Sequence, residues 1–258
     1  MQFHELLETL ARTTWKTIKS CSNAGIQLGE DAITSWNLTS IALHESGSVV
    51  VEDTRVNEST KGCDFELWVG SVSTGWNRYA IQAKKISPKT GQYSRLNHKV
   101  NGLPQIKILE SYAKSNRAAS LYCFFNNCAS PSTWSCTLPD EKEQLGCSVA
   151  PSKLVLEAIN TRGARNFSWI HNSASTATLP WRCLVRCPSL VNRGKSPLRG
   201  WPAPDTYWHA ALPTALRRLQ ELRTIEAITD SSAVLNNGAK LRPAWIGIID
   251  VSETRGAA

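Results

Sequence analysis

Two short apolar runs joined by turn-forming residues constrain the fold of this chain more than any other feature. Residues 65–69 alternate Phe, Leu and Val on one face with Glu and Trp on the other, and residues 79–83 form a second short run. Alternation with a period of two predicts a β-strand. Gly75 and Asn77 lie between the runs, where a hairpin needs turn residues. The sequence therefore predicts two neighbouring strands.

Polar residues stand at the ends of both predicted strands. Asp64 precedes the first strand, and Gln82 and Lys84 close the second. A carboxylate is a good ligand for Mg²⁺, while Gln and Lys side chains can hold an attacking water beside a phosphate. Such a pair of strands can hold a divalent metal ion against a phosphodiester.

The elements predicted on either side of this pair follow a definite order. Residues 28–41 carry apolar side chains at near-helical spacing, and residues 49–51 are a β-branched run. Pro104 suits the first turn of a helix, and residues 118–125 form another apolar run. The predicted order is helix, strand, strand, strand, helix, strand.

This order, together with the pattern D…QxK, resembles the PD-(D/E)XK nuclease superfamily over residues 25–125. Within it, the chain is similar to the Mrr-like branch, in which Gln replaces the second acidic residue. The resemblance implies an α/β fold with a restriction-endonuclease-like core, a mixed central sheet flanked by helices, over residues 1–127. Residues 128–258 would form a C-terminal α+β extension packed on that core.

The resemblance also implies an activity. It indicates a metal-dependent endonuclease of bacterial antiphage defence that hydrolyses phosphodiester bonds of DNA with Mg²⁺ or Mn²⁺. Such a protein would act alone, as a homo-oligomer or with a partner sensor protein. The alternative is a non-catalytic nucleic-acid-binding or assembly subunit of a defence complex, because Gln82 already departs from the acidic pattern.

The same resemblance assigns roles to individual residues. Asp64, Glu30 and the backbone carbonyl of Ala83 would bind the metal, since an acidic residue on the helix before the first strand commonly completes the site in Mrr-like nucleases. Lys84 would orient the water or neutralise charge on the phosphate, and Gln82 would complete the catalytic set. The helix dipole alone also favours an acid in a first helical turn, so both explanations of Glu30 stay open.

Three neighbouring residues are weaker candidates. Glu66 lies two residues beyond Asp64 and therefore on the same face of the strand. It could act as an outer-shell base or ligand, or belong to a solvated face. Asp31 is the alternative to Glu30, and Lys85 faces away from Lys84.

The charge distribution independently favours a nucleic-acid substrate. The chain has 29 Lys and Arg against 21 Asp and Glu, and no acid lies between Glu66 and Glu110 or between Glu157 and Asp205. Basic surfaces attract a polyanion through counterion release, although soluble domains also carry such charge as a solvated surface. The residues expected to contact nucleic acid are Lys85, Lys89, Arg95 and Lys99, with a polar loop of Gln92, Tyr93, Asn97 and His98. The second acid-free stretch contains Arg162, Arg165, Arg182, Arg186, Arg193, Lys195 and Arg199.

Eight cysteines raise the question of a structural metal. A disulfide framework is not expected in a reducing cytosol. Cys136, Cys147, Cys183 and Cys187 could supply four thiolates for Zn²⁺, but neither pair has the tight CxxC spacing of a zinc knuckle. Buried thiols are the simpler explanation.

Length and composition suit a cytoplasmic protein with a large core. The chain has 258 residues, of which 41% are hydrophobic. Its first 20 residues predict an amphipathic helix and not a secretory signal, and no apolar run approaches the roughly 18 residues of a membrane span. Residues 208–228 predict a helix with Pro213 in its first turn, and residues 244–251 predict a final strand.

Overall fold

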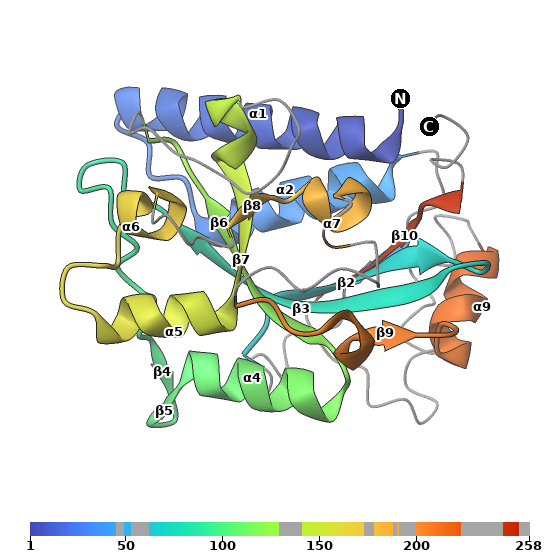
Figure 1. Cartoon of the computed structure of the whole chain (residues 1–258). Helices are drawn as coiled ribbons and strands as arrows, with labels where there is room; N and C mark the ends of the chain where they lie inside the picture. Colours follow the sequence, from blue (N-terminus) through green and yellow to red (C-terminus); the bar gives the residue numbers. More distant parts are fainter. Residues whose placement is uncertain are drawn as a thin grey trace.

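The structure is a computed structural model, which describes residues 1–44, 49–52, 62–128, 141–172, 178–187, 190, 200–222 and 245–252. In this part of the chain a mixed β-sheet lies between two layers of helices (Figure 1). The fold therefore belongs to the α/β class. No helix among these residues is long and apolar enough to cross a membrane.

The described strands form an eight-stranded sheet in the order β1-β10-β2-β3-β6-β7-β8, with β9 paired to β3. The strands are β1 (Val49–Glu52), β2 (Phe65–Ser71), β3 (Gly75–Lys85), β6 (Ala119–Phe125), β7 (Cys147–Pro151), β8 (Leu179–Pro180), β9 (Trp208–His209) and β10 (Trp245–Asp250). A separate small hairpin consists of β4 (Lys99–Val100) and β5 (Leu103–Pro104). β2 and β3 are antiparallel, and β3 and β6 are parallel.

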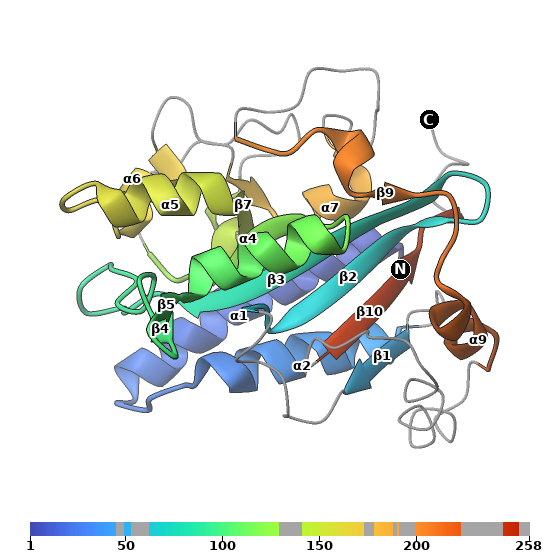
Figure 2. The ribbon, with the colours of Figure 1, turned by 90° about the horizontal axis from the view of Figure 1, so that it is seen from below.

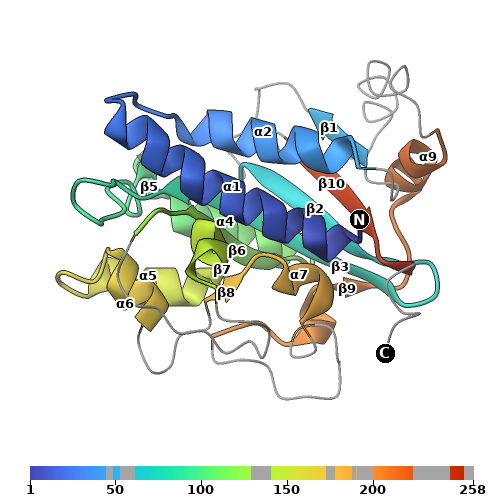
Figure 3. The ribbon, with the colours of Figure 1, turned by 90° about the horizontal axis from the view of Figure 1, so that it is seen from above.

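Helices cover both faces of the sheet (Figures 1 and 3). The first face carries α1 (Phe3–Asn23), α2 (Glu30–Ala42) and the short α7 (Cys183–Arg186). The opposite face carries α4 (Gln105–Ser115), α5 (Ser152–Asn160) and α6 (Phe167–Asn172), and α9 (Thr214–Leu222) lies beside the β1–β10 edge. Two 3₁₀ helices, η1 (Lys142–Gly146) and η2 (Pro204–Thr206), complete the described elements.

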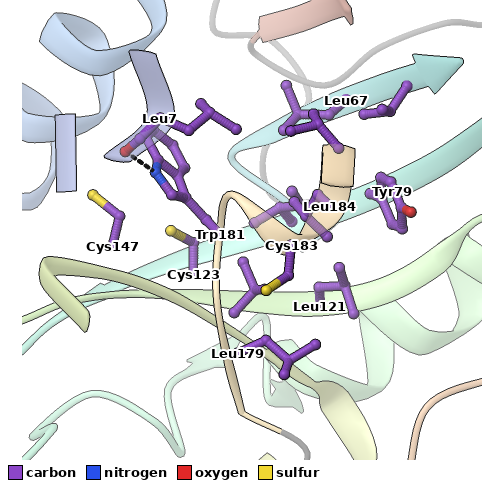
Figure 4. Close-up of a cluster of buried hydrophobic side chains, with 14 of the residues drawn as sticks. Leu7, Leu67, Tyr79, Leu121, Cys123, Cys147, Leu179, Trp181, Cys183 and Leu184 are labelled. Carbon is purple, nitrogen blue, oxygen red and sulfur yellow. Dashed lines mark hydrogen bonds between the residues drawn. The ribbon is translucent and has the colours of Figure 1, made fainter. Parts of the chain in front are cut away.

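The alternating residues of the central strands fill one core on the α1 side and two on the opposite side, the second of which joins Trp68 and Trp76 with Ile246, Ile248 and Leu216. On the α1 side, odd-numbered residues of β2 and β3 such as Leu67 and Tyr79 pack with Leu7, Trp181 and Leu184 (Figure 4). The Trp181 indole N–H donates to the carbonyl of Leu7 at 2.7 Å, which satisfies a polar atom inside this core. On the other side, even-numbered residues pack under α4, α5 and α6.

Most elements lie where the sequence predicts them, but the helix expected over residues 208–228 begins only at Thr214. Trp208 and His209 are instead strand β9, which pairs with Asn77 and Trp76 of β3. The physical reason is twofold. β6 pairs with β3 only from Tyr79 onward, so the first residues of β3 need another partner, and Pro213 favours a helix that starts after it.

The final strand lies inside the sheet. β10 runs parallel to β2 and antiparallel to β1, so the strand at residues 49–52 is not the neighbour of β2. β10 reads Trp-Ile-Gly-Ile-Ile-Asp and is apolar on both faces, which is typical of a central strand. Strands β7, β8 and β10, which all come from residues beyond 128, therefore belong to the same sheet as the β2–β3 hairpin.

Candidate functional site

The β2–β3 hairpin brings Asp64 to Gln82 and Ala83. The Asp64 N–H donates to the carbonyl of Ile81 at 2.9 Å, directly before the first pair of the ladder, Phe65 with Ile81. One carboxylate oxygen of Asp64 then accepts hydrogen bonds from the Ala83 N–H at 2.6 Å and from the Gln82 side-chain amide at 2.5 Å. The predicted contact between the start of one strand and the end of the other is therefore present.

Glu30 reaches the same end of β3 from the first residue of α2. Its Oε2 accepts a hydrogen bond from the Lys85 N–H at 2.8 Å, and its Oε1 forms an ion pair with Lys84 Nζ at 3.4 Å. The Lys84 side chain is 7% exposed and the Glu30 side chain 30% exposed. An acid at this helical position is also favoured by the helix dipole, so its placement has a structural cause as well. Asp31, the alternative, is exposed.

The two carboxylates occupy equivalent places along one edge of β3. β3 extends past the beginning of β2, so the N–H groups of Ala83 and Lys85 find no partner in β2. Asp64 and Glu30 accept these two hydrogen bonds instead. Residues two apart on a strand are about 7 Å apart, so this edge sets two acidic groups side by side. Figure 2 shows the beginning of β2, the end of β3 and the start of α4 at the same end of the sheet.

A second glutamine, which the sequence did not single out, holds the first. Gln105 is the first residue of α4, and its side-chain amide donates to Gln82 Oε1 at 2.7 Å. Both side chains are buried. The sequence shows only that a glutamine follows Pro104 at the start of a predicted helix. This position does not predict that its side chain contacts Gln82.

The donor set has the chemistry that suits Mg²⁺ or Mn²⁺. The carboxylates of Asp64 and Glu30 and the Ala83 carbonyl are hard oxygen donors, whereas Gln82 turns its amide nitrogen toward Asp64 and its oxygen toward Gln105. Across the described residues, no three or more His, Cys, Asp and Glu side chains are grouped so that they could hold a metal ion. A metal here would therefore depend on two carboxylates completed by neutral oxygens and water.

The structure does not bring Glu66 to this group. Its carboxylate is fully buried and accepts two hydrogen bonds from the Arg78 guanidinium, at 2.9 and 3.0 Å, and one from the Tyr112 hydroxyl at 2.6 Å. Burial lowers the pKa of Arg78, but the charge of Glu66 and its hydrogen bond outweigh this and raise that pKa overall. Arg78 also lies over the Trp68 ring at 5.0 Å. Glu66 thus belongs to an interior ion pair.

A basic loop follows the site. Lys89, Arg95 and Lys99 are exposed, and none of them forms an ion pair with any residue that the structure describes. The loop is anchored by Tyr93 and Leu96, which are buried. The expectation that Tyr93 lies in a polar surface is therefore wrong, because its hydroxyl donates to Asn126 in the interior at 2.5 Å.

The second acid-free stretch does not present all its arginines to solvent. Arg182 is 2% exposed and pairs with Glu8 of α1 at 3.0 Å, and Arg186 hydrogen-bonds to His4 of the same helix. These contacts attach α7 to α1, so the prediction of a nucleic-acid surface is wrong for Arg182. Arg162 is exposed. Arg193, Lys195 and Arg199 lie outside the described residues.

The zinc hypothesis can be followed for three of its four cysteines, since Cys136 lies outside the described residues. Cys147, Cys183 and Cys187 are buried in the apolar core on the α1 side, where Figure 4 shows the first two among leucine and aromatic side chains. Burial raises the pKa of the Cys147 thiol to about 12 despite hydrogen bonds with Thr14 and Asn37. Zinc binds thiolates, so the metal-free protein keeps Cys147 as a core thiol, and the four-cysteine zinc site stays a prediction.

Fold and site together define an α/β protein with acidic, amide and ammonium groups gathered at one end of a mixed sheet. The chain belongs to a protein family of unknown function (DUF6615), whose model matches residues 3–244. No curated protein and no solved structure shows significant similarity to the chain.

Proposed function

We propose that this protein is a metal-dependent endonuclease that hydrolyses phosphodiester bonds of DNA on a restriction-endonuclease-like core. One observation carries the proposal. Asp64, Gln82, Lys84 and Glu30 come from three separate elements and meet at the end of β3 through direct hydrogen bonds and an ion pair. Carboxylate, amide and ammonium groups in contact are what metal-assisted attack on a phosphodiester needs.

The chain topology around the site supports the same function. α2 precedes the antiparallel β2–β3 hairpin, and α4 then connects β3 to the parallel strand β6. This succession agrees with the order of elements in the PD-(D/E)XK superfamily. The insertion of β10 between β1 and β2 is the feature of this chain that departs from a simple consecutive sheet.

The residues of the site would divide the chemistry among them. Asp64, Glu30 and the Ala83 carbonyl would hold Mg²⁺ or Mn²⁺, and a bound ion supplies Lewis acidity and a more acidic water. Lys84, held by Glu30 and shielded from solvent, neutralises the charge that develops on the phosphate. Gln82 fixes the Asp64 carboxylate, and Gln105 in turn fixes Gln82.

The basic loop supplies the affinity for the substrate. Lys89, Arg95 and Lys99 follow β3 directly and are exposed, so a DNA strand whose phosphate enters the site would run over them. Contacts of this kind are independent of sequence. The resemblance to Mrr-like nucleases further implies that the protein acts in the cytoplasm of a bacterium against foreign DNA, as a homo-oligomer or with a sensor protein.

A second candidate function is a non-catalytic nucleic-acid-binding or assembly subunit. The observation in its favour is that Asp64 and Glu30 already have a structural task, because they accept the N–H groups of β3 that β2 leaves unpaired. In that case Asp64 and Glu30 only stabilise the sheet, and the basic loop alone binds the nucleic acid.

Cleavage of plasmid DNA with and without Mg²⁺ or Mn²⁺ distinguishes the two functions. The endonuclease should nick or linearise the plasmid only with metal, and Lys84→Ala should lower the rate by about 100-fold, the effect of removing one transition-state donor. Lys114→Ala, which changes an exposed lysine of α4, is the matched control and should leave the rate unchanged. DNA binding without cleavage under all metal conditions would establish the second function instead.

A further inference from the structure

Among the residues that the structure describes, the buried hydroxyls of Tyr122 and Tyr79 have no hydrogen-bond partner, and of the two only Tyr122 lies on the face of the sheet that carries Gln82. Tyr122 lies on β6 and is fully buried. A buried hydroxyl without a partner costs stability, and phenylalanine would avoid that cost. Phe124 and Phe125 of the same strand are buried and already show that β6 accommodates large apolar rings.

Register places Tyr122 beside the candidate site. In the parallel β3–β6 ladder, Tyr122 is the direct partner of Gln82, and side chains of paired residues lie on the same face of a sheet. Gln82 holds the Asp64 carboxylate through its amide. Tyr122 and Phe124, the partner of Lys84, are thus the β6 residues beside the catalytic set, and Tyr122 is the one that carries a polar group.

Electrostatics point the same way. Burial, followed by the negative charges of Asp64, Glu110 and Glu30, raises the pKa of Tyr122 above that of an ordinary tyrosine. The hydroxyl therefore remains protonated at neutral pH and can donate a hydrogen bond, but it cannot serve as a base. Among these carboxylates the Asp64 charge has the largest effect on it, although no hydrogen bond joins the two residues.

We propose that the Tyr122 hydroxyl belongs to the Asp64 site and donates a hydrogen bond to an oxygen atom held there, either a metal-bound water or a phosphate oxygen of the substrate. This inference rests on the proposed function. It gives this buried donor, which has no partner among the described residues, a partner that arrives with the ligand. It also adds a neutral donor to a site whose other donor to substrate, Lys84, is charged.

Tyr122→Phe tests the proposal because it removes only the hydroxyl. Tyr79→Phe is the matched control, since Tyr79 is equally buried but packs in the core on the opposite face of the sheet (Figure 4). For both variants and the wild type, plasmid cleavage gives kcat and KM, calorimetric titration gives the Mn²⁺ affinity, and thermal unfolding gives the midpoint.

The expected result is a loss of about 10-fold in kcat for Tyr122→Phe, with an unfolding midpoint that is unchanged or raised and with Tyr79→Phe unaffected. A parallel fall in Mn²⁺ affinity without DNA identifies a metal-bound water as the partner. Unchanged Mn²⁺ affinity identifies a phosphate oxygen.

Wild-type kinetics in Tyr122→Phe, an equal loss in Tyr79→Phe, or a loss that follows a lowered unfolding midpoint would each overturn the proposal. Failure of the proposed endonuclease function is recognised separately, from DNA cleavage and Mn²⁺ binding by the wild type. A wild-type protein that neither cleaves DNA nor binds Mn²⁺ removes the site and the role of Tyr122 with it. A wild type that binds Mn²⁺ without cleaving still upholds the proposal if Tyr122→Phe weakens the binding of Mn²⁺, or of DNA in the presence of Mn²⁺, and overturns it if both affinities are unchanged.

Discussion

Two acids on the same strand face, Asp64 and Glu66, have opposite surroundings. Glu66 is fully buried, and each of its oxygens accepts a hydrogen bond from Arg78 or Tyr112. Asp64 stands at the open end of the hairpin, is half-buried, and is held by a neutral amide and a backbone N–H. The interior of the hairpin encloses a carboxylate together with its counter-charge, whereas at the open end the Gln82 amide and the Ala83 N–H hold the Asp64 carboxylate.

The difference separates an acid whose counter-charge lies beside it in the interior from an acid that an amide and a backbone N–H hold at the end of the sheet. A buried carboxylate with a bidentate arginine gains nothing from a further ligand and is strongly destabilised if its partner is lost. The Asp64 carboxylate instead accepts hydrogen bonds from two uncharged donors, the Gln82 amide and the Ala83 N–H. The same division applies to the cations, since Arg78 and Arg182 are enclosed with acids, while Lys89, Arg95 and Lys99 are exposed.

The largest effect should come from breaking the enclosed pair. Glu66→Gln leaves the Arg78 charge buried without its counter-charge, so the free energy of unfolding should fall by roughly 3 to 5 kcal/mol. Lys107→Met is the control, because it removes the partially exposed Lys107–Glu110 pair and should cost less than about 1 kcal/mol. Urea denaturation measures both. A loss for Glu66→Gln as small as that of the control would mean that the interior pair contributes little to the fold.

The second effect extends the comparison to another enclosed polar cluster. His171 is buried, its Nδ1–H donates to the Phe167 carbonyl at 3.0 Å, and its Nε2 accepts from the Ser148 hydroxyl at 2.8 Å. Burial lowers the pKa of His171 from 6.5 to about 4. The unfolded chain therefore binds a proton between pH 6.5 and 4 that the folded protein does not. Stability is full above pH 6.5 and falls as the pH drops toward 4, by about 3 kcal/mol for this residue.

Denaturation at pH 7 and at pH 4.5 measures that loss. The fall between the two values should be smaller in His171→Gln, which has no titrating ring, whatever its stability at pH 7. An identical pH dependence in the variant and the wild type would show that His171 is charged in the folded protein or is not enclosed.

The smallest effect concerns the exposed cations. Replacing Lys89, Arg95 and Lys99 together by Gln should reduce the slope of log affinity for DNA against log salt by about 2 to 3, since each phosphate contact contributes roughly 0.9. Replacing Lys16, Lys19 and Arg217, which are exposed on α1 and α9, should leave the slope unchanged. Fluorescence anisotropy at several salt concentrations gives both slopes. Equal reductions would place the binding surface elsewhere.

The sequence predicts those parts of the site whose signals are local. Alternation placed Asp64 and Gln82 at neighbouring strand ends, and the acidic first turn of a helix marked Glu30. Gln105 and Tyr122 could not be found in this way, because their relation to Gln82 depends on a helix start and on the β3–β6 register. The contact between Arg78 and Glu66 also depends on the ladder, in which Glu66 pairs with Ala80.

The same distinction holds for the fold. Residues 245–250 have the composition of a buried strand, and this was sufficient to predict a strand. Their insertion between β1 and β2 joins segments far apart in the chain, and no local pattern encodes such a pairing. The depth of Tyr93 was missed because a tyrosine in a polar loop carries no sign of an interior partner such as Asn126.

Asp64→Asn tests the central claim most directly, because the asparagine carbonyl can still accept the Ala83 N–H while the negative charge is lost. If Asp64 is a metal ligand, the variant should unfold within about 1 kcal/mol of the wild type. Its Mn²⁺-dependent plasmid cleavage should fall by at least about 100-fold, or about 2.7 kcal/mol in activation free energy. Asp64→Ala, which also removes the acceptor, should be destabilised by a further 1 to 3 kcal/mol or so. Cleavage by Asp64→Asn at the wild-type rate, or cleavage by the wild type in excess EDTA, would contradict the account.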